Sequence, residues 1–141
     1  MSEGPSSSPV LELHFELRTL DEVRISQAPI RRFAAELGFD RAAQWQVTIA
    51  ASEAGTNMVK YGGGGRLTLR RIVEPRVGLR LEARDHGPGI GDLELALRDH
   101  LSEGRGLGLG LGAIQRMMDA LGWQNLADGG LLWAEKYLDA R

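Results

Sequence analysis

Residues 104–121 read GRGLGLGLGAIQRMMDAL, with glycine at every second position before a helical pattern begins. The alternation could form a strand with its leucines on one face, but glycine is poor in strand interiors. Glycine loses more conformational freedom on folding than any other residue, so a run of them needs a reason. Free amides at a helix N-terminus bind anions, phosphate above all. We therefore predict a flexible loop over 104–110 that binds a polyphosphate and feeds a helix over about 111–121.

Two common phosphate motifs do not fit this stretch. A Walker A loop needs G-x-x-x-x-G-K-[ST], which is absent from the chain. The dinucleotide fingerprint G-x-G-x-x-G is not matched either, and a predicted helix rather than a strand precedes the loop. What remains is a glycine loop that could close as a lid, with Arg105 adding positive charge near the phosphates.

Asp85 ends a predicted strand and is followed by the loop HGPGIG at 86–91. Strand parity places it on the same face as Leu79, Leu81 and Ala83, where a carboxylate is costly unless something bonds to it. One interpretation is that the strand has already ended and Asp85 caps the turn. The other is a buried acceptor for a ligand donor such as an exocyclic amine.

Glu53 and Asn57 lie four residues apart on the predicted helix over 41–61, so they share a face. Such pairs usually belong to a solvated polar stripe. Here the surrounding sequence IAASEAGTNMV is small and apolar, which indicates close packing on several sides. A carboxylate and an amide on a packed stripe could serve as a general base and a magnesium ligand.

The composition is that of an ordinary globular protein. Its 141 residues predict one domain over 10–141 behind a disordered tail over 1–9. A net charge of −2 argues against nucleic acid as a partner, and no apolar run approaches the roughly 20 residues that span a membrane. The absence of cysteine excludes disulfides and fits a cytoplasmic protein. His14, His86 and His100 have no ligand spacing, so no histidine metal site is expected.

Periodicity and turn signals predict the order β-α-α-β-β-α-α-β-β. Hairpin-joined strands indicate a mixed, mostly antiparallel sheet with helices on one face, an α+β fold of two layers. The bounds that we expect are strands at 10–18, 66–74, 77–85 and on both sides of the ADGG turn at 127–130, with helices at 20–37, 41–61, 93–101 and about 111–121. Glycines are expected to end three of these helices: Gly38 the first, GGGG at 62–65 the second and Gly122 the last. Pro29 must start or kink the first helix, and the arginines at 66, 70 and 71 indicate a solvated strand face or a partner surface.

Three stretches in this order resemble one family. SEAGTN at 52–57 resembles an asparagine-containing N box, while DHGPGI at 85–90 and GRGLGLG at 104–110 resemble two glycine boxes. Together they are typical of the GHKL ATPase/kinase superfamily. The run at 106–121, with ELGF at 36–39 and KY at 60–61, is similar to RsbT-type switch kinases of bacterial partner-switching, or anti-sigma regulatory, modules.

The resemblance implies a Bergerat fold that holds ATP and Mg²⁺ between helices under a lid. Asp85 would accept from the adenine amino group, Asn57 would hold magnesium, and Glu53 would act as the general base. Gly87 and Gly89 would line the base pocket. The remaining residues expected to bind nucleotide are Lys60, Ile90, Arg105, Gly106, Leu107, Gly108, Leu109 and Gly110.

The implied function is that of a serine/threonine protein kinase that phosphorylates a STAS-domain antagonist and then engages a downstream phosphatase or regulator. Relatives form dimers or join large scaffolds. Two positions depart from the family pattern: Gln27 stands where an arginine often reaches the terminal phosphate, with Arg24 one turn earlier, and Gly130-Leu131 replaces a Gly-Thr pair. These departures favour the alternative of a non-catalytic binding module for nucleotide, a partner protein or a sigma factor.

Overall fold

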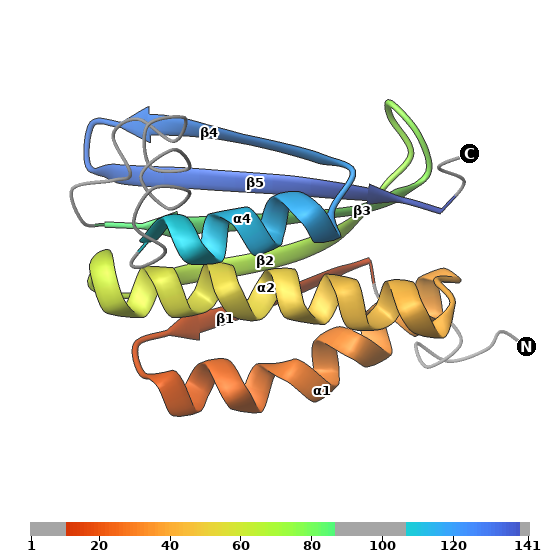
Figure 1. Cartoon of the computed structure of the whole chain (residues 1–141), viewed down its shortest axis with the longest axis horizontal. Coiled ribbons are helices and arrows are strands. Elements are labelled where there is room, and N and C mark those ends of the chain that lie inside the picture. Colours follow the sequence, from red (N-terminus) through yellow and green to blue (C-terminus); the bar gives the residue numbers. More distant parts are fainter. Residues whose placement is uncertain (1–10, 87–106, 139–141) are drawn as a thin grey trace, which may run out of the picture.

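The computed structural model describes residues 11–86 and 107–138, and within them three helices lie on one face of a five-stranded sheet (Figure 1). The elements in chain order are β1 (Glu12–Leu17), α1 (Leu20–Leu37), α2 (Arg41–Tyr61), β2 (Gly65–Ile72), β3 (Gly78–Asp85), α4 (Leu107–Met117), β4 (Ala120–Leu126) and β5 (Gly129–Tyr137). The strand order is β1-β2-β3-β5-β4, and every described pairing is antiparallel. The two-layer α+β prediction is confirmed. The predicted tail at 1–9 and helix at 93–101 lie outside the described residues.

Capping side chains set where the two long helices begin. Thr19 Oγ1 accepts a hydrogen bond from the Glu22 amide, and the Glu22 carboxylate accepts one from the Thr19 amide, both at 3.1 Å. Asp40 Oδ1 accepts from the Ala43 amide at 2.9 Å at the start of α2. Gly38, with φ 108°, closes α1 in a left-handed conformation that suits glycine. Both helices therefore have their predicted bounds.

The core forms between the helices and one face of the sheet, which we call the inner face. Leu79, Leu81 and Ala83 of β3 alternate onto this face and are at most 3% exposed. The other largest fully buried side chains come from β1, β2 and all three helices: Leu17, Ile30, Val47, Leu67, Leu69, Leu111 and Ile114. Strand parity thus places Asp85 on the inner face, as predicted.

The opposite, outer face of the sheet carries polar side chains, and no described helix covers it. Arg80 donates to Glu82 and to Glu135, each at 2.7 Å, and Arg70 pairs with Glu82 at 3.4 Å. Arg66 pairs with Glu16 across β1 and β2. These ion pairs between neighbouring strands agree with a solvated strand face for Arg66 and Arg70. Arg71 is opposite Leu79 in the register and so does not share this face, and the alternative of a partner surface stays a prediction.

Two sequence predictions on the helices and strands of the second half are wrong. The helix expected over 111–121 is α4, which begins at Leu107 and ends at Met117. Gly122, expected to stop that helix, lies inside β4 opposite Trp133. A Cβ on Gly122 would lie 2.3 Å from the Trp133 indole, so this glycine gives the ring room rather than ending a helix.

Two smaller differences concern the first half. Pro29 lies inside α1, which excludes the first of its two predicted roles, that of starting the helix, and leaves the second, that of a kink. β2 and β3 occupy residues 65–72 and 78–85, so Val77 lies outside β3 and is exposed.

Candidate functional site

Three elements end together on one side of the molecule: the C-terminus of α2, the end of β3 and the N-terminus of α4, all at the left in Figure 1. A glycine at position 62 allows the C-terminus of α2 to touch the end of β3. A Cβ on Gly62, the C-cap of α2, would lie 2.8 Å from Asp85 Cβ and Cγ. We call Glu53, Asn57, Asp85 and the first turn of α4 the candidate site.

Asp85 is the last residue of β3 and is 8% exposed. Its Oδ1 accepts a hydrogen bond from the Gly130 amide of β5 at 3.2 Å. Gly62 packs against its side chain, and Gly129 lies so close that a Cβ there would sit 2.0 Å from the Asp85 carbonyl oxygen. Asp85 is therefore a buried strand residue between backbone walls, which favours the ligand acceptor over the turn cap.

Glu53 and Asn57 lie one turn apart on α2, and both are partly buried. The alanines around them, Ala50, Ala51 and Ala54, are at most 1% exposed, so the predicted close packing is present. Asn57 Nδ2 is buried and has no hydrogen-bond partner among the described residues. An unsatisfied buried amide costs about 1–3 kcal/mol, so this atom favours a bound acceptor. Lys60, one turn beyond Thr56, is exposed.

The glycine-rich stretch is helical earlier than expected. Leu107, Gly108, Leu109 and Gly110 belong to α4 instead of a loop. Helix N-termini leave amide groups of the first turn without intrahelical acceptors, so an anion can still bind here. Of the other predicted nucleotide-binding residues, Gly87, Gly89, Ile90, Arg105 and Gly106 lie outside the described residues.

Gln27 joins the two long helices beside the candidate site. Its Nε2 donates to Ser52 Oγ at 3.0 Å, and Ser52 precedes Glu53 in α2. Arg24 instead pairs with Asp21 at 2.7 Å, and its side chain is 72% exposed. Arg24, the cation suggested in place of the missing arginine, is thus paired with Asp21 on the exposed side of α1.

The residue beside Asp85 on β5 is Gly130 rather than Leu131. Gly130 is opposite Asp85 in the strand register, while Leu131 is opposite Arg84 and shares its outer face. A backbone amide therefore stands next to the carboxylate, and the Leu131 side chain lies on the other side of the sheet.

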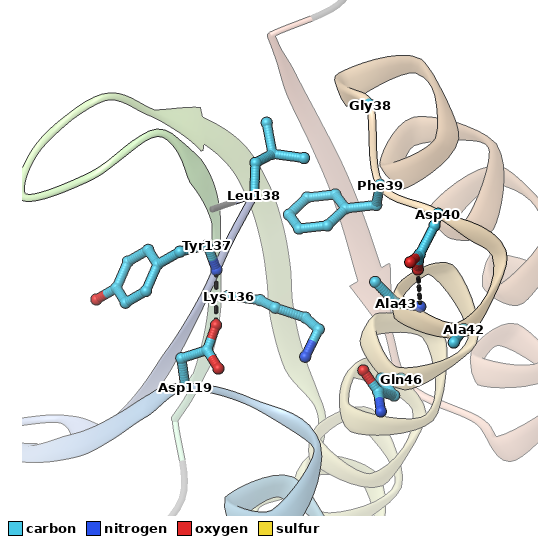
Figure 2. A pocket seen from close by; sticks show the side chains of 10 residues that line it. All are labelled: Gly38, Phe39, Asp40, Ala42, Ala43, Gln46, Asp119, Lys136, Tyr137 and Leu138. Carbon is cyan, nitrogen blue, oxygen red and sulfur yellow. Dashed lines mark hydrogen bonds between the residues drawn. The ribbon is translucent and has the colours of Figure 1, made fainter. Parts of the chain in front are cut away.

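A cavity of about 360 Å³ lies at the far end of the sheet from Asp85 (Figure 2). Its floor includes Lys136, whose Nζ donates to the Met117 carbonyl at 2.8 Å, and Asp119, which accepts from the Tyr137 amide at 2.8 Å. The hydrogen bond from Tyr137 to Glu135, together with burial, raises the pKa of Tyr137 to about 12. None of the residues predicted to form a site lines this cavity.

Within residues 11–86 and 107–138, no three histidine, aspartate or glutamate side chains gather as a metal site. None of the three described helices is both long and apolar enough to cross a bilayer.

Sequence reasoning missed the glycine walls of Asp85. The run Gly62–Gly65 was interpreted only as a helix end, for which one glycine suffices. A Cβ on Gly65 would lie 2.2 Å from the Arg84 carbonyl oxygen and 2.9 Å from Asp85 Cα. The number of consecutive glycines was the available signal for this close approach.

Comparison with known proteins gives consistent matches. Residues 18–136 match the model of the histidine kinase-like ATPase domain. The serine/threonine-protein kinase RsbT of Bacillus subtilis (strain 168) is 36% identical over 101 residues, which cover 71% of this chain and 76% of that protein.

Two solved structures share the fold. The RsbU and RsbW domains of Rv1364c from Mycobacterium tuberculosis match 93% of this chain with a TM-score of 0.65 and 20% identity. Full-length ShkA in complex with AMPPNP matches 93% with a TM-score of 0.50 and 19% identity. This chain spans about a third of each of those two solved chains.

Proposed function

Since this chain belongs to the family of histidine kinase-like ATPase domains, we propose that it is an ATP-dependent serine/threonine protein kinase that works as a partner switch. The membership confirms the resemblance to the GHKL superfamily. The observation that carries the proposal is Asp85: a buried carboxylate between glycine backbones, at the same end of the molecule as the C-terminus of α2 and the N-terminus of α4.

Asp85 would recognise the adenine of ATP. A carboxylate on an apolar face accepts hydrogen bonds from an exocyclic amine, and charged hydrogen bonds are worth about 1.5–3 kcal/mol. Because Gly62, Gly65 and Gly129 have no side chains, their backbones pack directly against Arg84 and Asp85, which supports a fixed position for the carboxylate. Gly87, Gly89 and Ile90 are proposed to complete this base pocket.

Asn57 and α4 would bind the phosphates. The unpartnered Nδ2 of Asn57 suits a phosphate oxygen, and its Oδ1 offers a ligand for Mg²⁺. Bound magnesium would neutralise charge on the phosphates. The amides at residues 106–110, with Lys60 and Arg105, are proposed to contact the same groups, because the positive end of a helix favours anions.

Glu53 would act as the general base. Its carboxylate would accept the proton of a serine or threonine hydroxyl while that oxygen bonds to the terminal phosphorus and the bond from phosphorus to ADP breaks. Glu53 lies one turn before Asn57 on α2, and this spacing supports a carboxylate beside the proposed phosphate site. The acceptor in this proposal is a STAS-domain antagonist in the cytoplasm, and the released kinase then engages a phosphatase or another regulator.

The experiment is phosphate transfer from labelled ATP with magnesium to recombinant STAS-domain proteins of the same organism. We expect Glu53→Ala to abolish transfer while calorimetry still detects nucleotide binding. Glu36→Ala, which removes an exposed glutamate from α1, is the matched control and should transfer normally. Unchanged transfer by Glu53→Ala would remove Glu53 from the mechanism.

One observation favours a second function, a non-catalytic module that binds nucleotide and a partner. Gln27 is neutral and bonded to Ser52, and Arg24 is paired with Asp21, so neither supplies a free cation to a terminal phosphate. Calorimetry with MgATP on the parent and on Asp85→Asn separates the two functions. MgATP binding by the parent without phosphate transfer to STAS-domain proteins would support the non-catalytic module. No MgATP binding at all would leave partner binding as the single remaining function.

A further inference from the structure

Three large hydrophobic side chains are exposed on α2, and two of them, Trp45 and Ile49, are neighbours on the helix. Trp45 is 45% exposed and Ile49 is 39% exposed. They lie one turn apart, and α2 packs between α1 and α4 with its outer ridge uncovered by any described element (Figure 1). Exposed neighbouring apolar side chains on a helix ridge are typical of a surface that meets another protein.

This pair leads directly to Glu53. Trp45, Ile49 and Glu53 are separated by steps of four residues, and each step rises about 6 Å along the helix and turns by about 40°. The row therefore crosses the ridge from the α1 side to the α4 side over about 12 Å. An apolar group bound at Ile49 would sit one turn from the carboxylate proposed to accept the substrate proton.

Positive charge lies at the far end of the row. The Arg31 guanidinium lies 4.9 Å from the centroid of the Trp45 ring, and Arg41 precedes Trp45 by one turn. Among the described residues, no carboxylate forms an ion pair with either arginine. The strip of Arg31, Arg41, Trp45 and Ile49 thus passes from cationic to apolar and ends at the acidic Glu53.

Two contacts hold α1 and α2, the helices that carry the strip, against each other. Gln27 Nε2 bonds to Ser52 Oγ at 3.0 Å, and the Arg31 contact on Trp45 ties α1 to α2 two turns away. A preformed surface loses little side-chain freedom on binding, which favours affinity. Trp and Arg are also the residues that most often dominate interface energies.

We propose that this strip is the docking surface for the protein substrate, and the proposal rests on the kinase function given above. The partner surface it fits carries an acidic side chain for Arg31 and Arg41, an apolar side chain for Trp45 and Ile49, and the acceptor hydroxyl at Glu53, in that order. The strip extends about 18 Å from Arg41 to Glu53, which a folded protein spans and a small substrate does not. The strip is cationic at one end and acidic at the other, so its charges set the orientation in which the partner binds.

The test measures steady-state phosphorylation of the STAS-domain protein that the parent chain phosphorylates. Trp45→Ala and Arg31→Glu should raise KM for that protein by about tenfold or more with kcat nearly unchanged, because docking is removed and the reacting groups are not. MgATP affinity should stay the same. Ile25→Ala is the matched control: Ile25 is 69% exposed but lies on the side of α1 away from Gln27, and its KM should equal that of the parent.

A carboxylate-to-lysine change in the STAS protein that restores the KM of Arg31→Glu would support the assigned orientation. An unchanged KM in Trp45→Ala and Arg31→Glu, with an active parent, would overturn the strip while leaving the kinase function intact. Loss of self-association in Trp45→Ala by sedimentation, with KM unchanged, would assign the strip to a second copy of this chain and also overturn the proposal. A parent that phosphorylates no STAS protein would overturn the kinase function and the strip with it.

Discussion

Replacing Gly62 with alanine tests how closely α2 holds Asp85. The new Cβ would lie 2.8 Å from Asp85 Cβ and Cγ, whereas ordinary contacts begin at 3.4 Å, so the atoms must separate by about 0.6 Å. Gly62 has φ −111°, which alanine adopts, so the clash with Asp85 is the main cost. Overpacking of this kind costs about 1–3 kcal/mol, which lowers Tm by roughly 3–10 °C in a domain of this size.

The same displacement should weaken nucleotide binding. A shift of about 0.6 Å is enough to break the 3.2 Å hydrogen bond from the Gly130 amide and to misplace the carboxylate, so we expect MgATP affinity to fall about tenfold. Gly63→Ala is the matched control. It has no atom within 4 Å of its Cβ but has φ +75°, so its cost is backbone strain of about 1–2 kcal/mol.

Thermal melting and calorimetry on both variants separate contact from strain. Both should melt below the parent, but only Gly62→Ala should lose MgATP affinity. Equal affinity in the two variants would refute the packing of Gly62 against Asp85 as a determinant of the site.

Three further predictions follow from single contacts. Asp85→Asn should weaken MgATP binding by about 10- to 100-fold in calorimetry, since a hydrogen bond to a charged group is lost; normal affinity would exclude Asp85 as the adenine acceptor. Ile114→Ala should lower the free energy of unfolding by about 2–5 kcal/mol in urea titrations, because Ile114 is fully buried on α4; a smaller loss would contradict that packing. In a Tyr61→Phe background, ultraviolet titration should give Tyr137 a pKa of about 12, and stability should fall as pH rises from 10 to 12, because the folded state keeps a proton that the unfolded state has lost. Glu135→Gln should bring that pKa back toward 10, and an unchanged value would reject the Tyr137–Glu135 bond as its cause.

Much of the fold could be predicted because its signals are local. Thr19 and Asp40 cap helices from their own first turns, and Gly38 ends α1 through its own backbone conformation. Period-two alternation placed Asp85 on the inner face correctly, since parity depends only on counting along one strand.

The errors arose where contacts between distant residues decide. Gly122 was interpreted as a helix stop, but its role depends on Trp133, which is paired with it only in the folded sheet. The Gly/Leu repeat before Leu111 predicted a loop, whereas α4 begins at Leu107. This helix packs on α2, and tertiary packing outweighs the poor helix propensity of glycine. The walls of Asp85 were missed for the same reason.

The candidate site was only partly open to prediction. Glu53, Asn57 and Asp85 could be chosen from residue type and spacing, and the structure brings their elements to one end. The roles assigned to them remain predictions. The unpartnered amide of Asn57 and the bond between Gln27 and Ser52 depend on how two helices pack, which no single segment encodes.

The outer face of the sheet offers a practical consequence. The chain has no cysteine, so one introduced at Thr68, in the middle of β2 on that face, would be a unique chemical handle. Tethered there, the protein would present its helices to solution in a single orientation. Nucleotide and partner binding could then be measured on a surface without the linker approaching the candidate site or the strip on α1 and α2.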